Sequence, residues 1–228
     1  MDTLPEKNQM IKKRLKILKN QFKNFNIDGY IIPKNDEFFS EYSKNDRLKI
    51  ISNFSGSAGY AIILKNKNYL FVDGRYTIQA QIESGKNFEI VNFEKIFNCK
   101  LFKDLTIGID PKVFTSSQIK KFFGKSNRIK IISENLIDQL TKPKTDNNKQ
   151  FFSLPDNISG MSYKRKISNL IKLLKKNSAQ YIFISAPENV AWLLNIRGHD
   201  NPNSPIPNCK ILLDTKKNIF FLSEKNKV

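Results

Sequence analysis

Polar residues stand beside the apolar runs of this sequence, where a folded chain could use them to bind a ligand. The turn Asp73-Gly74-Arg75-Tyr76 directly follows such a run, and others stand at Asp36, Ser40-Glu41-Tyr42, Arg197 and Asp200. The ends of strands are where α/β folds gather ligand contacts, although most such positions are merely solvated. Two interpretations of Arg75 are therefore open. It holds its own turn through an ion pair with Asp73 or Glu41, or it offers a permanent positive charge to a ligand.

The residue types that most enzymes need are scarce. His199 is the only histidine, and the two cysteines, Cys99 and Cys209, stand far apart in apolar contexts typical of buried thiols. One histidine cannot supply a metal site of three or more ligands, nor act as a triad base without a nearby nucleophile. The glycines of Gly56-Ser57-Ala58-Gly59 are too closely spaced for a phosphate-binding Walker loop and predict a tight bend with close backbone approach. We expect no catalytic residue, metal ligand set or cofactor in these 228 residues.

Composition argues for a globular protein without a nucleic-acid or membrane partner. The chain is 39% hydrophobic with 18 phenylalanines, and its net charge is +18 with a pI near 9.8. Only six of the 39 basic residues are arginine, and the lysines are spread along the whole chain, which is typical of solvated faces rather than of a nucleic-acid site. No apolar run approaches the ~20 residues that span a bilayer. Asp2 and Glu6 stand where an export signal would avoid acids, so we expect a cytoplasmic protein.

Regular elements must hold these polar residues in place, and their order occurs twice. An apolar stripe predicts a helix over residues 11–25, followed by a strand at 28–33. A second stripe predicts a helix over 163–174, followed by a strand at 179–184. Three further pairs come next in the same order: Asn53-Phe54-Ser55-Gly56 with Asn195-Ile196-Arg197-Gly198, residues 61–64 with 210–213, and residues 67–72 with 217–222. The shared order predicts two copies of one α/β domain.

The two copies differ in extent. The first continues through a helix at 77–83, strands at 88–93 and 105–110, a helix at 116–123 and a strand at 129–132, which predicts a mixed sheet flanked by helices. We predict a first domain at 1–142, a linker at 143–154 and a second, incomplete domain at 155–228. Half of the second sheet would then lack cover, so we expect this chain to be a fragment or a truncated reading frame.

Several linked motifs resemble the Xaa-Pro aminopeptidases (aminopeptidase P). The resemblance covers almost the whole chain, in order. In the first half it rests on Tyr30-Ile31-Ile32-Pro33, Ser40-Glu41-Tyr42, Phe54-Ser55-Gly56-Ser57-Ala58-Gly59, Asp73-Gly74-Arg75-Tyr76 with Gln79-Ala80, Gly108-Ile109-Asp110-Pro111 and Asn135-Leu136-Ile137-Asp138. In the second half it rests on Ala191-Trp192-Leu193-Leu194-Asn195-Ile196-Arg197-Gly198 with Asp200, Pro202 and Pro205.

The resemblance implies two creatinase/prolidase N-terminal-type domains in tandem, the second truncated. It also implies a C-terminal pita-bread domain, absent here, that holds two divalent metal ions, commonly manganese, and cleaves the bond before a proline at the second position of a peptide. This chain would be the non-catalytic N-terminal portion, inactive alone, contributing substrate access and subunit contacts in a homodimer. By the same resemblance Arg75 contacts the substrate peptide. The chain departs from the family pattern at His199, where a small residue is usual, and in Leu70-Phe71-Val72, where many relatives have tryptophan.

Two rival functions remain open from the sequence. Creatinase-type N-terminal domains also occur in proteins without peptidase activity, so a non-enzymatic peptide-binding or protein-binding module fits the same fold. The retained DGRY turn favours the peptidase lineage. A basic nucleic-acid-binding protein is the other rival, and it would lose affinity steeply with added salt.

Overall fold

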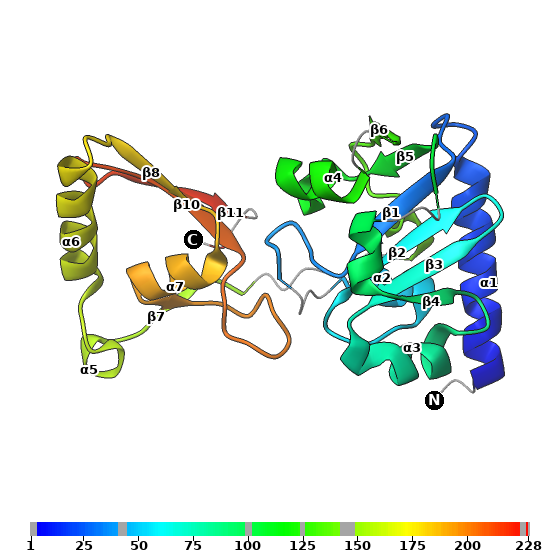
Figure 1. Cartoon of the computed structure of the whole chain (residues 1–228). Helices are drawn as coiled ribbons and strands as arrows, with labels where there is room; N and C mark the ends of the chain where they lie inside the picture. The colour runs from blue at the N-terminus through cyan, green and yellow to red at the C-terminus, as the bar shows by residue number, and fades with distance from the viewer. Residues whose placement is uncertain are drawn as a thin grey trace. The chain divides into compact units, whose positions relative to one another are not determined.

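The computed structural model describes residues 4–40, 45–98, 102–123, 126–141, 149–223 and 227. The chain divides into two compact units (Figure 1). Unit 1 consists of Met1–Glu37 and Asn45–Pro143, and unit 2 consists of Lys144–Val228 with the short segment Phe38–Lys44. Each unit is described on its own.

Unit 1 is built on one mixed sheet of six strands in the order β4-β3-β2-β1-β5-β6. The β1/β2 and β2/β3 pairs are antiparallel, whereas β3/β4, β1/β5 and β5/β6 are parallel. The mixed sheet that the sequence predicts is therefore confirmed. Its elements are α1 (Leu4–Gln21), β1 (Gly29–Pro33), α2 (Arg47–Ser52), β2 (Gly59–Leu64), β3 (Asn68–Val72), the 3-10 turn η1 (Gly74–Tyr76), α3 (Thr77–Ser84), β4 (Glu89–Asn92), η2 (Phe93–Asn98), β5 (Thr106–Ile109), η3 (Pro111–Val113), α4 (Ser116–Phe123), β6 (Arg128–Ile131) and η4 (Asp138–Leu140).

Both faces of the unit 1 sheet are covered. On one face, side chains such as Tyr30 and Ile63 pack with α1, α2, α3 and the segment around Leu136. On the other face, side chains such as Ile62 and Phe71 pack with η2 and α4. Because side chains alternate between the two faces of a strand, every residue of β1 is buried.

Unit 2 carries a smaller sheet of three antiparallel strands in the order β11-β10-β8. A second, two-stranded sheet joins β7 to β9. One face of the larger sheet packs on α6 and α7 around Ile167, Val190, Leu193 and Ile211. The elements are β7 (Phe152–Ser153), α5 (Asp156–Ser159), α6 (Tyr163–Lys176), β8 (Tyr181–Ile184), α7 (Pro187–Leu194), β9 (Ile196–Arg197), β10 (Cys209–Asp214) and β11 (Ile219–Ser223).

The internal repeat is present in three dimensions. The strand order β11-β10-β8 in unit 2 matches the central β3-β2-β1 of unit 1, with antiparallel pairing in both. After the first strand of each copy comes a helix, α2 or α7, that the sequence patterns did not predict. Each of these helices ends at an asparagine in the left-handed conformation, Asn53 at φ 64° and Asn195 at φ 54°. Asparagine tolerates this conformation better than other non-glycine residues, which explains the shared residue.

A second shared contact ties the two helices of each copy together. In unit 1 the Arg14 guanidinium donates to the carbonyl oxygen of Ile50 at 2.8 Å, and in unit 2 the Lys166 ammonium donates to that of Trp192 at 2.7 Å. Both carbonyls lie three residues before the capping asparagine, in the last helical turn, where carbonyls lack an intrahelical partner. A basic side chain of the first helix satisfies this acceptor in both copies.

The first helix differs in its bounds from the prediction. It begins at Leu4 and ends at Gln21, so the predicted range of 11–25 misses its first two turns and overruns its end. Phe22 and Phe25 lie in the turns beyond it, and Asn26 at φ 45° closes them. None of the helices in the described part of the chain has the length and apolar content of a membrane-spanning helix.

Candidate functional site

The loop before β2 and the turn after β3 emerge at the same end of the unit 1 sheet. Gly59 at the start of β2 pairs with Val72 at the end of β3, because the two strands run antiparallel. The loop of residues 53–58 and the turn of residues 73–76 therefore meet there. We call these two segments, with α3, the DGRY site.

Asp73 organises the turn. Its carboxylate caps η1 by accepting from the backbone N–H of Arg75 at 3.0 Å, and also accepts from Arg75 Nε at 2.9 Å. These donors, the Arg75 side chain first, lower the pKa of the Asp73 carboxyl below its ordinary value. Of the two ion pairs that the sequence left open for Arg75, the one with Asp73 forms. The other partner, Glu41, lies outside the described residues.

The turn does not use the conformational freedom of its glycine. Asp-Gly pairs are typical of turns with positive φ at glycine, but among the described glycines only Gly160 has positive φ. Gly74 instead opens a 3-10 turn, and a Cβ added to it would meet no atom within 4 Å. The reason is that Asp73 acts as a helix cap, which places the following residues in right-handed rather than left-handed backbone.

The neighbouring loop is fixed to α3 by hydrogen bonds. Glu83 accepts from the backbone N–H and the hydroxyl of Ser55, both at 2.7 Å, and Gln79 donates to the Ser55 hydroxyl at 2.8 Å. The hydroxyls of Ser57 and Tyr76 are 2.9 Å apart, so they join the loop to the DGRY turn. The site is therefore held by several elements before any ligand arrives.

Close packing in this loop requires its glycines. A Cβ at Gly56 would lie 2.2 Å from the Phe54 ring, and a Cβ at Gly59 would lie 2.9 Å from the carbonyl oxygen of Phe71. Phe54 in turn meets the Tyr76 ring edge-on, with 5.9 Å between centroids. The predicted bend is present at residues 56–58, and close backbone approach is confirmed at Gly59.

Arg75 projects from this braced turn into solvent. Its side chain is 73% exposed, and its guanidinium carbon lies 5.4 Å from the centre of the Tyr76 ring. An arginine that donates to a carboxylate through Nε and lies beside an aromatic ring is a planar, permanently charged donor whose range of directions is limited. Such a group can bind a carboxylate or a peptide carbonyl oxygen.

The polar residues of unit 2 have structural roles of their own. Arg197 donates to the carbonyl oxygens of Ala191 and Ile196, at 3.2 and 2.8 Å. Asp200 accepts from the Asn208 N–H and forms a buried ion pair with Lys227, both at 2.7 Å. His199 packs on Phe152, with 5.3 Å between ring centroids.

The other residues singled out from the sequence lie outside the DGRY site or outside the described residues. Asp36 is buried, and Ser40 lies among the described residues. Glu41, Tyr42 and Cys99 lie outside them. Cys209 is a buried free thiol whose pKa burial raises to about 12. No group of three or more His, Cys, Asp or Glu side chains suited to a metal ion occurs in the described part of the chain. Within these described residues, a di-metal centre therefore has no fitting ligand set.

Sequence reasoning missed the support around Arg75. Glu83 stands four residues after Gln79 on α3, a spacing that places both on one helix face, so a shared network could have been anticipated. The missed helices also carried signals. Asp46 caps α2 by accepting from the Lys49 N–H at 3.0 Å, and Pro187 stands in the first turn of α7.

The fold and the repeat define two α/β domains in tandem. In the first domain both faces of the sheet are covered. The Creatinase/Prolidase N-terminal domain family matches residues 14–140, and a second model of that description matches residues 141–228. This chain belongs to the creatinase/prolidase N-terminal domain family.

Two proteins similar to this chain are described as Xaa-Pro aminopeptidases. The chain is 33% identical over 210 residues to a probable Xaa-Pro aminopeptidase P of Laccaria bicolor, covering 85% of this chain and 33% of that protein. It is 30% identical over 238 residues to Xaa-Pro aminopeptidase 1 of Dictyostelium discoideum, covering 94% and 38%. The chain thus spans a third or slightly more of the length of these relatives.

A solved structure shares the fold over nearly the whole chain. It is an X-prolyl aminopeptidase from Caenorhabditis elegans, described as a cytosolic enzyme with a di-nuclear active site. The TM-score is 0.84 at 24% identity, over 96% of this chain and 39% of that one. At this identity the likeness shows the tandem fold.

Proposed function

We propose that this chain is the N-terminal, non-catalytic portion of a Xaa-Pro aminopeptidase, and that Arg75 contacts the peptide substrate. The observation that carries the proposal is the exposed arginine on a turn that Asp73, Tyr76 and the Ser55–Glu83 network hold rigidly. The Arg75 side chain is 73% exposed, so most of it is accessible to a ligand. The similarity to Xaa-Pro aminopeptidases supports the substrate class.

The rest of the proposal rests on the relatives. Hydrolysis would require the part of those proteins that this chain does not match, with two divalent metal ions that we take to be manganese. The complete protein would act in the cytoplasm as a homodimer on peptides with proline at the second position. We take the domain boundaries as 1–142 and 155–228, with the linker between them.

The test is a fusion of this chain to the remaining part of the Dictyostelium discoideum relative, assayed on short Xaa-Pro peptides. Arg75→Ala should lower kcat/KM by an amount that corresponds to about 1.5–3 kcal/mol of lost transition-state stabilisation. This is the usual contribution of a hydrogen bond to a charged group. Arg75→Lys should recover little, because lysine keeps the charge but loses the planar fork. Lys120→Ala, a change of a basic residue on unit 1 outside the DGRY site, is the control.

Two measurements on the same variants separate binding from structure. If Arg75 only holds the turn, Arg75→Ala lowers the Tm while the folded enzyme keeps its kcat/KM. Unchanged kcat/KM at full folded content would remove the substrate contact from the proposal. A non-enzymatic binding module would instead bind Xaa-Pro peptides without turnover in any fusion, and that outcome would replace the peptidase proposal.

A further inference from the structure

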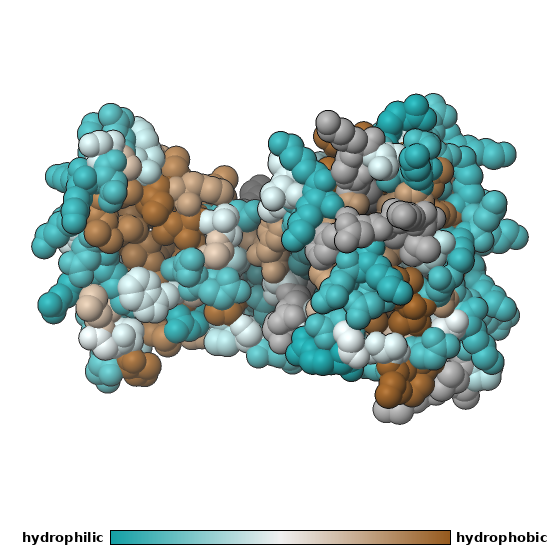
Figure 2. Space-filling view, in the orientation of Figure 1, coloured by the Kyte–Doolittle hydropathy of each residue, from teal (hydrophilic) through white to brown (hydrophobic). Residues whose placement is uncertain are grey.

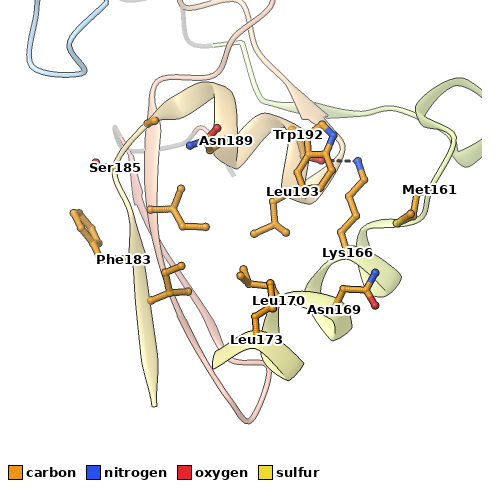
Figure 3. Close-up of a pocket in the computed structure, with 13 residues that line it drawn as sticks. Met161, Lys166, Asn169, Leu170, Leu173, Phe183, Ser185, Asn189, Trp192 and Leu193 are labelled. Atoms are coloured by element: carbon orange, nitrogen blue, oxygen red, sulfur yellow. Dashed lines mark hydrogen bonds between the residues drawn. The ribbon is translucent and has the colours of Figure 1, made fainter. Parts of the chain in front are cut away.

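A hollow in unit 1 differs in chemistry from the cavity of unit 2. The unit 2 cavity, of about 550 Å³, is bordered by α6, β8 and α7 and is mainly apolar. Leu170, Leu173 and Leu193 line it (Figure 3), and Figure 2 shows brown, hydrophobic residues gathered there. Lys166, the one lysine among its described lining residues, donates to the Trp192 carbonyl oxygen at 2.7 Å. The charge of this lysine is therefore engaged within the protein.

The hollow in unit 1, which we call the lysine pocket, is polar and basic. Its volume of about 480 Å³ is within the range of small-molecule sites. It is bordered by α1, the start of β3 and the turn between α3 and β4. Its described lining includes Lys12, Lys16, Lys19, Lys86, Asn68 and Asn87. None of the described lining residues is acidic, so the pocket gathers four positive charges.

Three of these lysines come from one face of α1. Lys12, Lys16 and Lys19 follow one another at intervals of four and three residues, a spacing that places side chains on the same side of a helix. At the helical rise of about 1.5 Å per residue, the row extends over about 10 Å. Lys86 follows α3, so the fold adds the fourth charge from a distant part of the sequence. Figure 2 shows hydrophilic residues along the edge of unit 1 that α1 occupies in Figure 1.

The four ammonium groups have no counter-charge in the described part of the chain. None of them forms an ion pair or a hydrogen bond there, and Glu89, two residues after Asn87, is paired with Lys67 at 2.6 Å. Burial lowers the pKa of Lys19, so its charged form costs free energy that no carboxylate offsets. Charges of one sign in a concave site raise the local potential and attract ions of the opposite sign. A bound anion would therefore relieve the repulsion among these lysines.

Hydrogen bonds hold the asparagines of the lysine pocket in place. Asn68 donates through Nδ2 to the carbonyl oxygen of Asn87 at 2.9 Å, and Asn87 donates through Nδ2 to Asn8 Oδ1 at 3.1 Å. These bonds join β3 to the turn before β4 and to α1. Asn68 Oδ1 is buried and has no hydrogen-bond partner in the described part of the chain. The pocket therefore combines unpaired ammonium donors with an unsatisfied acceptor, and phosphate and hydroxyl groups suit these two needs.

We propose that the lysine pocket binds a small molecule that carries two or more phosphate groups. Ammonium groups bind phosphate oxygens as point charges, and a row of about 10 Å is longer than one phosphate group, which favours phosphates at separate positions. The phosphates belong either to a phosphorylated sugar or to an inorganic phosphate chain. The unsatisfied acceptor of Asn68 favours the sugar, because a sugar also brings hydroxyl donors. The inference depends neither on Arg75 nor on peptidase activity.

Calorimetric titration of the full chain tests the proposal with fructose 1,6-bisphosphate and inorganic tripolyphosphate as probes. At 0.1 M NaCl the Debye length is about 10 Å, so charges elsewhere on the chain contribute little. Fructose 1,6-bisphosphate should bind at one site, at least tenfold more tightly than inorganic phosphate, and should shift the NMR signals of the Asn68 and Asn87 amides. Tighter binding of tripolyphosphate at the same residues would support the proposal with a phosphate chain as the ligand.

Two double variants on α1 separate the pocket from the general charge of the chain. Lys12→Gln with Lys16→Gln removes two lysines of the pocket, and Lys7→Gln with Lys13→Gln removes two lysines outside it. Both variants lose the same charge from the same helix, and both should fold because all four side chains are exposed. The pocket variant should raise the Kd about tenfold or more, and the control variant should change it by less than about twofold.

Four results would overturn the proposal. Neither probe binds at millimolar concentration, or the two double variants lose affinity equally, which would assign binding to the general charge. Inorganic phosphate binds as tightly as both probes, which would mark a site for a single anion. A single-stranded oligonucleotide displaces the probe and loses its own binding in the pocket variant, which would make nucleic acid the occupant. None of these measurements involves peptide cleavage, so failure here is distinguishable from failure of the Arg75 proposal.

Discussion

Lys166 should be a main determinant of the stability of unit 2. Its side chain is buried, and its ammonium donates to the Trp192 carbonyl oxygen at 2.7 Å and to Asn195 Oδ1 at 2.6 Å. It also lies 4.3 Å from the centre of the Trp192 ring. Burial lowers the pKa of this lysine, so the charged form costs free energy that these contacts offset.

The size of the effect can be worked out from the contacts that are lost. Lys166→Met keeps the aliphatic stem but leaves two acceptors without their donor, each worth about 1–3 kcal/mol when buried. Removal of a buried charge recovers part of this stability. We therefore expect the free energy of unfolding of unit 2 to fall by about 2 kcal/mol. For a unit of this size that corresponds to a fall in Tm of roughly 8–16 °C. Lys166→Arg should retain much of the stability, because Arg14 makes the equivalent contact in unit 1.

Urea unfolding followed by Trp192 fluorescence tests this prediction, because the only tryptophan lies in unit 2. Lys172→Met, an exposed lysine on the same helix, is the matched control and should shift the midpoint little. The free energies of unfolding of Lys166→Met and Lys172→Met are compared. If they differ by less than about 0.5 kcal/mol, the usual range for surface substitutions, the two hydrogen bonds do not stabilise the unit and the reasoning is refuted.

Two further predictions concern one buried side chain in each unit. Arg47→Met should destabilise unit 1 by about 1–3 kcal/mol, because Asp138 and Glu37 lose the guanidinium that donates to both of them. Hydrogen exchange of the β1 amides measures this loss, and equal exchange rates in Arg47→Met and in the exposed control Arg128→Met would contradict the prediction. Burial raises the pKa of Cys209 from 9.0 to about 12, so its contribution to stability is complete below pH 9 and is lost as pH rises toward 12. The stability of the wild type should fall relative to Cys209→Ala over that window in urea titrations, and parallel curves would contradict the assignment.

The sequence predicted the long elements because their patterns are strong. Wide surfaces are buried by the apolar stripes of α1 and α6 and by the apolar runs of β1, β2 and β3. Because the buried positions must be apolar, they give these segments a regular sequence pattern. Helix α2 has six residues and α7 eight, too few for periodicity to stand out, so the residues at their N-terminal ends were the signals available. These are the cap Asp46 and the first-turn proline Pro187, and both residue types are also common in turns that lead into no helix.

The sequence motifs pointed to residues of the DGRY site but not to their geometry. Motif resemblance singled out Arg75, yet the choice between Asp73 and Glu41 as its partner depends on backbone directions that no local pattern encodes. The links from Ser55 to Glu83 and from Ser57 to Tyr76 join residues about 20 to 30 positions apart. Such contacts arise only when β2 and β3 pair and bring their flanking segments together.

The repeat itself helps to separate structural from functional residues. Features present in both copies are those that the shared frame requires: the left-handed asparagines Asn53 and Asn195, and the basic side chains that cap α2 and α7. The strand registers pair Gly59 with Val72 and Cys209 with Ser223, so β11 is aligned one residue later than the repeat of residues 67–72 with 217–222 predicts. The sequence has no arginine in residues 222–228, the stretch that follows the apolar run of the second copy. The strand pairing common to both copies does not depend on Arg75, and that favours its assignment to substrate over an assignment to the frame.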